Sequence, residues 1–303
     1  MPQPIAYLNG RFLPQDEASL PLHDAGFIMG ATVTDLCRTF NQRLYRLADH
    51  LSRFRQSCHL ARVSLHVSDD ELTRIAQQLV EQNAVLLKPD QELAVVLFAT
   101  PGPIGHYAGL LGEPGEGKPT LGLHTFPIPF HRYRALFERG AHLLVPNTRH
   151  VPAVCVDPRV KMRSRLFWWL AEQEARDQEP GSSALLLDLN GQVTETAGAN
   201  FLMVEQGVVI SPPKQSILGG ISLRIVEELC GQLAIPFEER PFTIDECLIA
   251  DEALLSGTPY CIAGVSQING EPVVWPGPIL LRLQEAWSQA VGLDFCRQIL
   301  ASR

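Results

Sequence analysis

The chain has 303 residues, of which 46% are hydrophobic and 19% are charged, and its formal net charge at pH 7 is -8. Such a chain is long enough for one large domain or two ordinary ones, each with its own apolar core. The negative net charge argues against nucleic acid or an anionic membrane surface as the main partner.

The sequence carries no sign of export or of a membrane anchor. Residues 1–5 lack the cationic segment that opens a signal peptide, and no apolar run approaches membrane-spanning length. The seven cysteines are scattered and form no CxxC pair, and the nine histidines show no metal-ligand spacing. We therefore expect a cytoplasmic protein with reduced thiols and no metal site.

The first half of the chain alternates predicted strands with predicted helices. Asn9-Gly10 is a hairpin signal between apolar residues. The predicted strands lie at residues 33–40, 92–99 and 121–126, and a short turn follows the first of them at 41–42. The predicted helices lie at residues 48–58, with Leu51, Phe54 and Cys58 on one face, and at residues 69–82, with Ser68 as N-cap.

A loop rich in glycine and proline interrupts this pattern at residues 101–119. Gly112 to Lys118 fit the GxxxxGK pattern of nucleotide-binding loops, but Pro119 stands where such a loop has Ser or Thr. Proline cannot ligate magnesium, and Glu113 and Glu116 would repel a triphosphate. We therefore interpret the segment as a surface loop and expect a domain boundary near residue 130.

The second half predicts a further mixture of strands and helices. The strands are expected at residues 143–145, 184–188, 201–204, 208–210, 253–256 and 262–268. The helices are expected at residues 221–233, 244–250 and 277–300. The order of these elements does not repeat as a βαβ array does, so the fold class is α+β in both halves.

Lys161 lies in a basic stretch just before an apolar helical run. Leu166, Trp169 and Leu170 recur at helical spacing, so we expect them to form the buried face of that helix. A partly desolvated lysine near Arg163 and Arg165 would lose its proton more easily than a solvated one, as a Schiff-base lysine requires. Most lysines are solvated surface charges, so the case for Lys161 depends on the segments that follow.

Two downstream segments offer groups that could bind a flat anionic ligand. Glu195 stands in a strand that returns from the turn Asn190-Gly191, and the small residues 197–199 leave room close to the backbone. Gly219 and Gly220 precede a helix that carries Ser222 in its first turn, so backbone N–H groups and a hydroxyl are offered to an anion. The turn Ser256-Gly257-Thr258 could also face a phosphate, whereas Arg53 by itself is interpreted as a surface arginine. Taken singly, each of these segments is more often an ordinary strand, loop or surface residue.

Together, these segments resemble the class IV aminotransferases. These are pyridoxal-phosphate enzymes of fold type IV that include branched-chain aminotransferases, D-amino-acid aminotransferases and aminodeoxychorismate lyases. The matching segments are Asn9-Gly10, Asp24-Ala25-Gly26, His50 to Arg53, Lys161, Val193 to Phe201, Ile217 to Ser222, Ala250 to Glu252 and Gly257-Thr258. Each is weak alone, but their order and spacing along nearly the whole chain make the likeness specific.

The resemblance implies a fold and an assembly. It implies an N-terminal α/β domain at residues 1–129 and a C-terminal pseudo-barrel domain at residues 130–303, which carries the Schiff-base lysine. The cofactor is implied to lie in the cleft between the two domains. A homodimer is also implied, in which a loop of the partner helps to close each pocket.

The resemblance also implies roles for single residues. Lys161 would form the Schiff base with pyridoxal 5'-phosphate and move the proton between the substrate Cα and the cofactor. Glu195 would face the pyridine nitrogen and keep it protonated. The phosphate would be held by Arg53, the backbone N–H groups of Leu218 and Ile221, the Ser222 hydroxyl and Thr258.

The likeness leaves the substrate open. Branched-chain enzymes have a tyrosine five residues after the lysine, where this chain has Leu166, and many relatives have an aromatic residue in place of Thr34. The substrate-binding arginine of D-amino-acid enzymes is missing near residues 100–102. Arg165 and Ala199-Asn200 are more similar to the lyases, whereas Gly257-Thr258 is more similar to the branched-chain group. The candidate substrate residues are Thr34, Gly257 and Arg38, the last as a partner for a substrate carboxylate.

Three functions therefore remain open on the sequence alone. The one we favour is transfer of an α-amino group from a branched-chain-like amino acid to a 2-oxo acid. The second is aminodeoxychorismate lyase, which would use the same cofactor and lysine but would eliminate pyruvate. The third is a pyridoxal-phosphate-binding protein without turnover, against which the presence of both Lys161 and Glu195 speaks.

Overall fold

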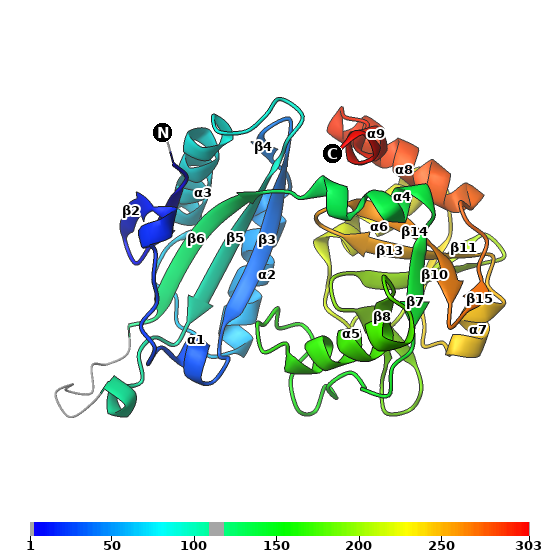
Figure 1. The fold of residues 1–303 in the computed structure, drawn as a ribbon, viewed down its shortest axis with the longest axis horizontal. Coiled ribbons are helices and arrows are strands. Elements are labelled where there is room, and N and C mark those ends of the chain that lie inside the picture. Colours follow the sequence, from blue (N-terminus) through cyan, green and yellow to red (C-terminus); the bar gives the residue numbers. More distant parts are fainter. Residues whose placement is uncertain (1–2, 109–117, 303) are drawn as a thin grey trace. The chain divides into compact units, whose positions relative to one another are not determined.

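The computed structural model describes residues 3–108 and 118–302, and the chain divides into two compact units. The first unit comprises Met1–Ile128 and Val160–Ser164, and the second comprises Pro129–Arg159 and Arg165–Arg303 (Figure 1). Apart from Lys118, the GxxxxGK-like segment lies outside the described residues. Within residues 3–108 and 118–302, no helix is both long enough and apolar enough to cross a membrane.

A six-stranded sheet with the strand order β2-β1-β6-β5-β3-β4 forms the first unit. Its strands are β1 (Ile5–Leu8), β2 (Arg11–Pro14), β3 (Val33–Phe40), β4 (Arg43–Leu44), β5 (Leu93–Thr100) and β6 (Thr120–Pro127). Asn9 and Gly10 take φ values of 48° and 91°, as the predicted two-residue hairpin turn requires. The hairpin and the three strands predicted in this half are confirmed.

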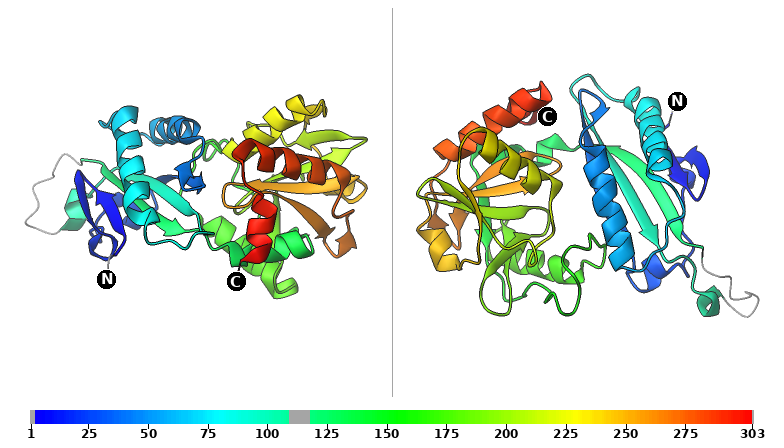
Figure 2. Two further views of the ribbon diagram at one scale, coloured as in Figure 1. Left: turned by 90° about the horizontal axis from the view of Figure 1, so that it is seen from above. Right: turned by 180° about the vertical axis from the view of Figure 1, so that it is seen from behind.

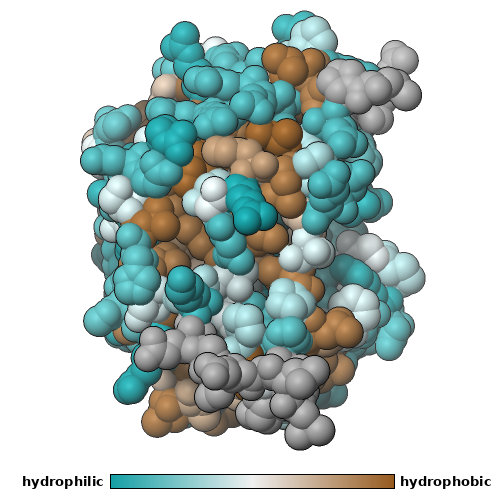
Figure 3. All heavy atoms as spheres, turned by 90° about the vertical axis from the view of Figure 1, so that its left-hand side faces the viewer, coloured by the Kyte–Doolittle hydropathy of each residue, from teal (hydrophilic) through white to brown (hydrophobic). Residues whose placement is uncertain are grey.

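Two helices, α2 (Leu47–Leu60) and α3 (Asp69–Ala84), cover one face of this sheet (Figure 2). Leu51, Phe54 and Cys58 of α2 are buried against the sheet, as their spacing predicts. The Ser68 side chain accepts the Glu71 N–H at 3.2 Å, so the predicted N-cap of α3 is confirmed. Short turns of helix complete the unit: η1 (Gln15–Glu17), α1 (Ala25–Ile28) and η2 (Gly105–Ala108). On the side that carries β2, the surface of this unit mixes apolar patches with hydrophilic side chains (Figure 3).

The second unit is built on a closed ring of strands. The ring runs β10-β13-β14-β7-β8-β9 and closes because Glu195 of β9 pairs with Asn200 of β10. The ring strands are β7 (Ala141–Leu144), β8 (Ser183–Leu187), β9 (Val193–Thr196), β10 (Asn200–Glu205), β13 (Glu252–Gly257) and β14 (Cys261–Ile268). Three further strands extend it: β11 (Val208–Ser211), β12 (Phe237–Glu239) and β15 (Glu271–Pro272). This ring is the pseudo-barrel implied by the family resemblance.

Helices pack on the outside of the ring. They are η3 (Phe130–Arg132), α4 (Arg134–Glu138), α5 (Leu166–Gln178), α6 (Ile221–Gln232), α7 (Ile244–Leu248), α8 (Pro278–Val291) and α9 (Phe295–Ala301). The helix predicted at residues 277–300 is in fact two helices, because Gly292 takes the left-handed φ of 65° that ends α8.

The prediction of which face of α5 is buried is wrong. Leu166, Trp169 and Leu170 are exposed, whereas Trp168, Ala171 and Ala175 are buried against the ring. Residues 166–170 are apolar at every position, so helical periodicity fits more than one face. The small side chains of Ala171 and Ala175 let α5 lie close to β8, and this close packing selects the face.

The placement of Lys161 also differs from the sequence-based division. Residues 160–164 were expected in the domain of residues 130–303, but they pack with the first unit. The reason is backbone pairing: the Thr34 N–H donates to the Lys161 carbonyl at 2.8 Å, and the Arg163 N–H donates to the Thr32 carbonyl at 2.8 Å. This short segment therefore extends the first unit alongside the start of β3.

Candidate functional site

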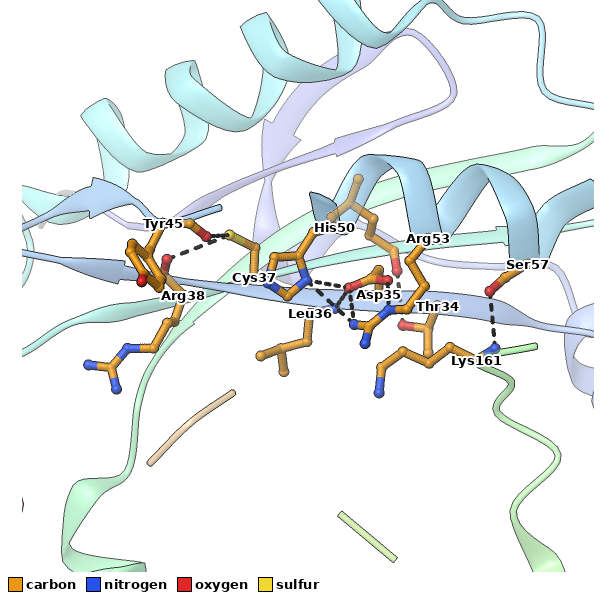
Figure 4. A network of polar contacts seen from close by, with 11 residues as sticks. Thr34, Asp35, Leu36, Cys37, Arg38, Tyr45, His50, Arg53, Ser57 and Lys161 are labelled. Carbon is orange, nitrogen blue, oxygen red and sulfur yellow. Dashed lines mark hydrogen bonds and ion pairs between the residues drawn. The ribbon is translucent and has the colours of Figure 1, made fainter. Parts of the chain in front are cut away.

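The first unit holds a buried charged cluster between β3 and α2 (Figure 4). The Arg53 guanidinium donates from Nε to Asp35 Oδ2 and from Nη2 to Asp35 Oδ1, both at 2.8 Å. The Nδ1 atom of His50 lies 2.7 Å from Asp35 Oδ1. Burial by itself would raise the pKa of Asp35, but the Arg53 guanidinium and the His50 contact outweigh it and hold that pKa well below its usual range.

This cluster shows how the sequence positions Arg53. A strand points successive side chains to opposite faces, so Asp35 of β3 faces α2. His50 and Arg53 are three residues apart on that helix and therefore reach the same carboxylate. Since Asp35 takes one edge of the guanidinium, a phosphate would have to meet Arg53 at its other edge.

Lys161 lies next to this cluster. Its backbone N–H donates to the Ser57 hydroxyl of α2 at 3.1 Å, and its carbonyl accepts from Thr34 of β3. Figure 4 shows the Lys161 amine on the side of β3 to which the Leu36 and Arg38 side chains point. The backbone of Lys161 is thus held by both α2 and β3, while its side chain extends toward the face that bears Arg38.

The two candidate substrate residues on β3 are both buried. The Thr34 hydroxyl donates to the Leu97 carbonyl at 2.9 Å, and only 3% of the residue is exposed. Arg38 is 2% exposed, its Nε donates to the Thr39 carbonyl at 3.1 Å, and its guanidinium carbon lies 3.8 Å from the centroid of the Phe40 ring. Arg38 is therefore a buried cation, in contrast to a solvated strand residue.

In the second unit, the central feature is the Glu195 carboxylate. Asn200 Nδ2 donates to Glu195 Oε2 at 3.0 Å, and the Leu218 N–H lies 3.3 Å from both carboxylate oxygens. The Nε2 atom of His150 lies 3.5 Å from Glu195 Oε1. Glu195 is thus a nearly buried carboxylate, held mainly by neutral donors.

A row of cross-strand neighbours surrounds Glu195. Glu195 stands opposite Asn200, and Asn200 stands opposite Ser256 of β13. Directly opposed residues in antiparallel strands place their side chains on the same face. Ser256 is 1% exposed, and its hydroxyl oxygen has no hydrogen-bond partner among the described residues. A buried hydroxyl in this state marks a place where a ligand atom or a water is expected.

The loop that begins α6 lies against this row. The Asn200 side chain donates to the Leu218 carbonyl at 2.9 Å, and a Cβ on Gly220 would lie 2.0 Å from Asn200 Oδ1. A larger residue there would displace the Asn200 amide from its contacts with Glu195 and Leu218. Ile221 and Ser222 follow in the first turn of α6 and are both buried.

Open space borders the loops next to Glu195. A Cβ added to Gly198 or to Gly219 would meet no atom within 4 Å. Gly257 is tighter, because its Cβ would lie 3.3 Å from the Gly198 carbonyl oxygen. Thr258 follows β13 in a turn and is partly buried. Gly198 and Gly219 are both exposed, so their backbone is uncovered.

The predicted residues therefore form two groups. Lys161, Arg53, Thr34 and Arg38 come together in the first unit, while Glu195, Leu218, Ile221, Ser222, Gly257 and Thr258 belong to the second. The Leu218 N–H, for which the family resemblance implies a phosphate contact, lies 3.3 Å from both Glu195 carboxylate oxygens in this structure. Sequence reasoning overlooked Asp35 and His150. It named Ser256 only within a possible ligand-binding turn and Asn200 only within the segment around Glu195, and it gave neither side chain a role of its own.

A separate hollow of about 780 Å³ lies at the C-terminal end of α2. Its lining includes Arg55, Cys58, His59 and Arg62, and none of the predicted site residues. Its position gives no reason to connect it with the groups around Lys161 or Glu195.

Comparison with known proteins gives a consistent result. The family model for class IV amino-transferases matches residues 32–268. A putative branched-chain-amino-acid aminotransferase of Methanocaldococcus jannaschii is 28% identical over 268 residues, with 88% of each chain covered. A D-alanine aminotransferase of Staphylococcus aureus is 26% identical over 292 residues, which cover 94% of this chain and 97% of that protein.

Solved structures give the same fold. The branched-chain amino acid aminotransferase of Escherichia coli matches with a TM-score of 0.86 at 23% identity, covering 95% of this chain and 94% of that one. A second branched-chain amino acid aminotransferase, solved with pyridoxamine 5'-phosphate, matches with a TM-score of 0.83 at 25% identity and covers the same shares of the two chains.

Proposed function

Because this chain belongs to the class IV aminotransferase family, we propose that it transfers an α-amino group from an amino acid to a 2-oxo acid with pyridoxal 5'-phosphate as cofactor. The donor we propose has a branched aliphatic side chain. The observation that carries this proposal is the buried Glu195 carboxylate, near which the loop residues Gly198 and Gly219 border open space. The same chain carries Lys161 near the buried cations Arg53 and Arg38.

The residues present suit this cofactor. A planar ring needs space close to the backbone, and Gly198 and Gly219 border such space. A protonated ring nitrogen needs a carboxylate, which Glu195 offers. The orphaned Ser256 hydroxyl lies on the same face and could take a polar atom of the ligand. The first turn of α6, with Ile221 and Ser222, suits a phosphate group.

Each residue then has a defined task. The bound cofactor withdraws electrons from the substrate Cα. The Lys161 amine takes the Cα proton and later returns it, and Ser57 and Thr34 hold its backbone in place for this. Glu195 keeps a proton on the ring nitrogen. Arg53 binds the phosphate, and Arg38 attracts the carboxylate of the substrate.

The excess of positive side chains near Asp35 in the first unit supports the anion-binding roles proposed for Arg53 and Arg38. Arg53, Arg38 and Lys161 contribute positive charge in the neighbourhood of the Asp35 carboxylate. Such a surplus of positive charge in a partly buried region attracts the anionic phosphate and carboxylate groups that this reaction handles.

Two classes of amino acid are candidates for the amino donor. The relatives named above include both branched-chain and D-alanine aminotransferases, at similar identity. The D-alanine relative makes a D-amino acid the second candidate donor. The lyase reaction is not favoured, because the relatives that we compared carry aminotransferase names.

We also propose a homodimer located in the cytoplasm. Apolar side chains exposed on the single chain support the dimer: Leu22, Phe27 and Met29 near α1, and Leu166, Trp169 and Leu170 on α5. A surface with this many large exposed apolar side chains is typical of a protein with a partner.

The test is an amino-donor panel with a lysine variant beside it. We expect purified protein to bind pyridoxal phosphate, to transaminate L-leucine and L-valine with 2-oxoglutarate, and to become labelled at Lys161 after borohydride reduction. Lys161→Ala should lose at least about a thousandfold in kcat, because the proton carrier is gone. Lys214→Ala, which removes an exposed lysine, should stay active.

Three results would contradict parts of the proposal. Full activity of Lys161→Ala would end the catalytic assignment of that lysine. Activity with D-alanine alone would replace the branched-chain donor. Pyruvate release from aminodeoxychorismate without any keto-acid acceptor would replace transamination by the lyase reaction.

A further inference from the structure

The Glu195 carboxylate has a neighbour that the proposed mechanism does not use, the imidazole of His150. Nε2 of His150 lies 3.5 Å from Glu195 Oε1, and only 10% and 11% of the two side chains are exposed. The His150 N–H donates to the Leu187 carbonyl at 2.9 Å, which ties this loop residue to the end of β8, beside β9. The pair therefore lies within one unit, with Glu195 on β9 and His150 in a loop that is hydrogen-bonded to β8.

The other ring nitrogen decides what this contact means. Nδ1 of His150 lies 3.0 Å from the Val151 carbonyl oxygen, and a carbonyl only accepts hydrogen bonds. Nδ1 therefore carries a proton. In a neutral ring, Nε2 then carries a lone pair 3.5 Å from the carboxylate oxygen. A ring that gains a second proton places a positive charge at that distance instead, and the contact becomes an ion pair.

The ring is held in this orientation by aromatic neighbours. Its centroid lies 5.7 Å from the Phe167 ring at 81° and 5.6 Å from the Trp168 ring at 76°. Both aromatics belong to α5, so the imidazole packs against that helix.

The other charged groups around His150 are engaged elsewhere. Arg165, at the start of α5, lies over Trp168 and donates to the Ala197 carbonyl. Arg149 donates to the carbonyls of Pro146 and Asn147. Asp188, after β8, accepts the N–H groups of Asn190 and Gln192 at 2.8 Å. Among the described residues, Glu195 is the charged group that the structure pairs with His150.

We infer that His150 is a positioning residue that sets how much of the Glu195 charge is available to the cofactor. This inference rests on the proposed function. When Nε2 takes a proton from solvent, His150 draws the negative charge of Glu195 toward itself. Glu195 then holds the proton of the cofactor ring nitrogen less tightly, and amino transfer slows. His150 thereby makes the reaction sensitive to acid through Glu195, without touching the reacting atoms.

The experiment compares holoenzymes across pH. In His150→Gln the side chain stays polar but cannot become charged. We expect kcat of the unsubstituted enzyme to fall about tenfold more than kcat of His150→Gln between about pH 8 and pH 5.5, with KM for the donor changed less than about twofold. The absorption spectrum of the bound cofactor should shift with pH in the unsubstituted enzyme and much less in the variant.

A matched control is available in the same unit. His142 pairs with Glu179 at 2.6 Å, but both side chains are about one-third exposed. His142→Gln should keep the pH profile of the unsubstituted enzyme. In a Glu195→Gln background, replacing His150 should change the cofactor spectrum no further, because the group through which it acts is gone.

A measurement without substitution guards against a variant that fails to fold. In the holoenzyme labelled with ¹⁵N-histidine, we expect the His150 ring to carry a proton on Nδ1 at every pH, and protonation of Nε2 to follow the change in cofactor absorbance. An Nε2 signal that changes independently of that absorbance would overturn the inference.

The outcomes separate this inference from the proposed function. An active enzyme in which His150→Gln has the same pH profile and spectrum as the unsubstituted protein would refute the role of His150 and leave transamination standing. A protein that neither binds pyridoxal phosphate nor transfers an amino group would refute both.

Discussion

At the scale of single residues, burial and neighbouring charge compete to set protonation. Asp35 and His50 are both buried and contact each other, yet Asp35 stays charged while His50 stays neutral. For Asp35, the Arg53 guanidinium and His50 outweigh burial, so its pKa is lowered and it stays charged. For His50, burial outweighs the attraction of Asp35, and the cations Arg53 and Lys161 add to it, so its pKa is also lowered and it stays neutral.

The neutral state of His50 predicts a pH dependence of stability. Below about pH 6.5, an unfolded chain protonates His50 while the folded protein resists this, so the free energy of unfolding falls as pH falls. Between about pH 7.5 and 5.5, we expect the unsubstituted protein to lose about 1 kcal/mol more of this free energy than His50→Gln. Urea unfolding at both pH values measures the difference.

His59 on the same helix provides the control. Its side chain is exposed, so His59→Gln should show the pH dependence of the unsubstituted protein. If His50→Gln and His59→Gln lose stability equally on acidification, His50 does not stay neutral in the folded state.

At the scale of elements, a buried carboxylate fixes the start of α8. The Glu252 carboxylate accepts the Ile279 N–H at 2.7 Å and the Leu280 N–H at 2.9 Å, two of the helix donors that have no partner within the helix. A Cβ on Gly277 would lie 2.0 Å from the carboxyl carbon of Glu252, so glycine is needed there. The segment 250–252, noted only as part of the family resemblance, therefore contains a residue that anchors the C-terminal helices to β13.

Removal of this carboxylate should destabilise the second unit. Glu252→Ala leaves two buried N–H groups without acceptors, so we expect the free energy of unfolding to fall by about 1–3 kcal/mol or more. Glu285→Ala, at an exposed position of the same helix, should change it by less than about 0.5 kcal/mol. Thermal and urea unfolding report both values, and equal losses in the two variants would contradict the capping role.

At the scale of the whole molecule, exposed apolar side chains predict self-association. Trp169 is 60% exposed and Leu166 70% exposed on α5, where a solvated helix face would carry polar residues. We proposed a homodimer partly on this ground. Burial of this surface in the proposed dimer would account for the apolar residues at 166–170 that do not enter the core of the chain.

This assembly can be tested directly. Light scattering after gel filtration should give twice the mass of one chain. Trp169→Glu should shift the protein toward the monomer, because a charge would then be buried in the interface. Ile249→Glu, which alters an exposed apolar residue at the end of α7, should leave the mass unchanged. A monomer for the unsubstituted protein at micromolar concentration would refute the dimer.

The sequence by itself determined the features that depend on neighbours a few residues away. Asn9-Gly10 predicted a hairpin because its backbone needs positive φ. Ser68 predicted an N-cap because its hydroxyl reaches an N–H three residues on. Leu51, Phe54 and Cys58 predicted the buried face of α2 because polar residues separate them. The family likeness added Lys161 and Glu195 as site residues.

Only the tertiary structure decided the features that depend on residues far apart in the chain. The apolar run at 166–170 could not select its own buried face, because packing against β8 selects it. Lys161 joins the first unit because its backbone pairs with β3, more than 100 residues earlier. The contacts of Asp35 with Arg53 and of His150 with Glu195 likewise appear only once strands and helices are packed together. Local patterns specify elements, but the partners of a buried charge are set by which elements the fold brings together.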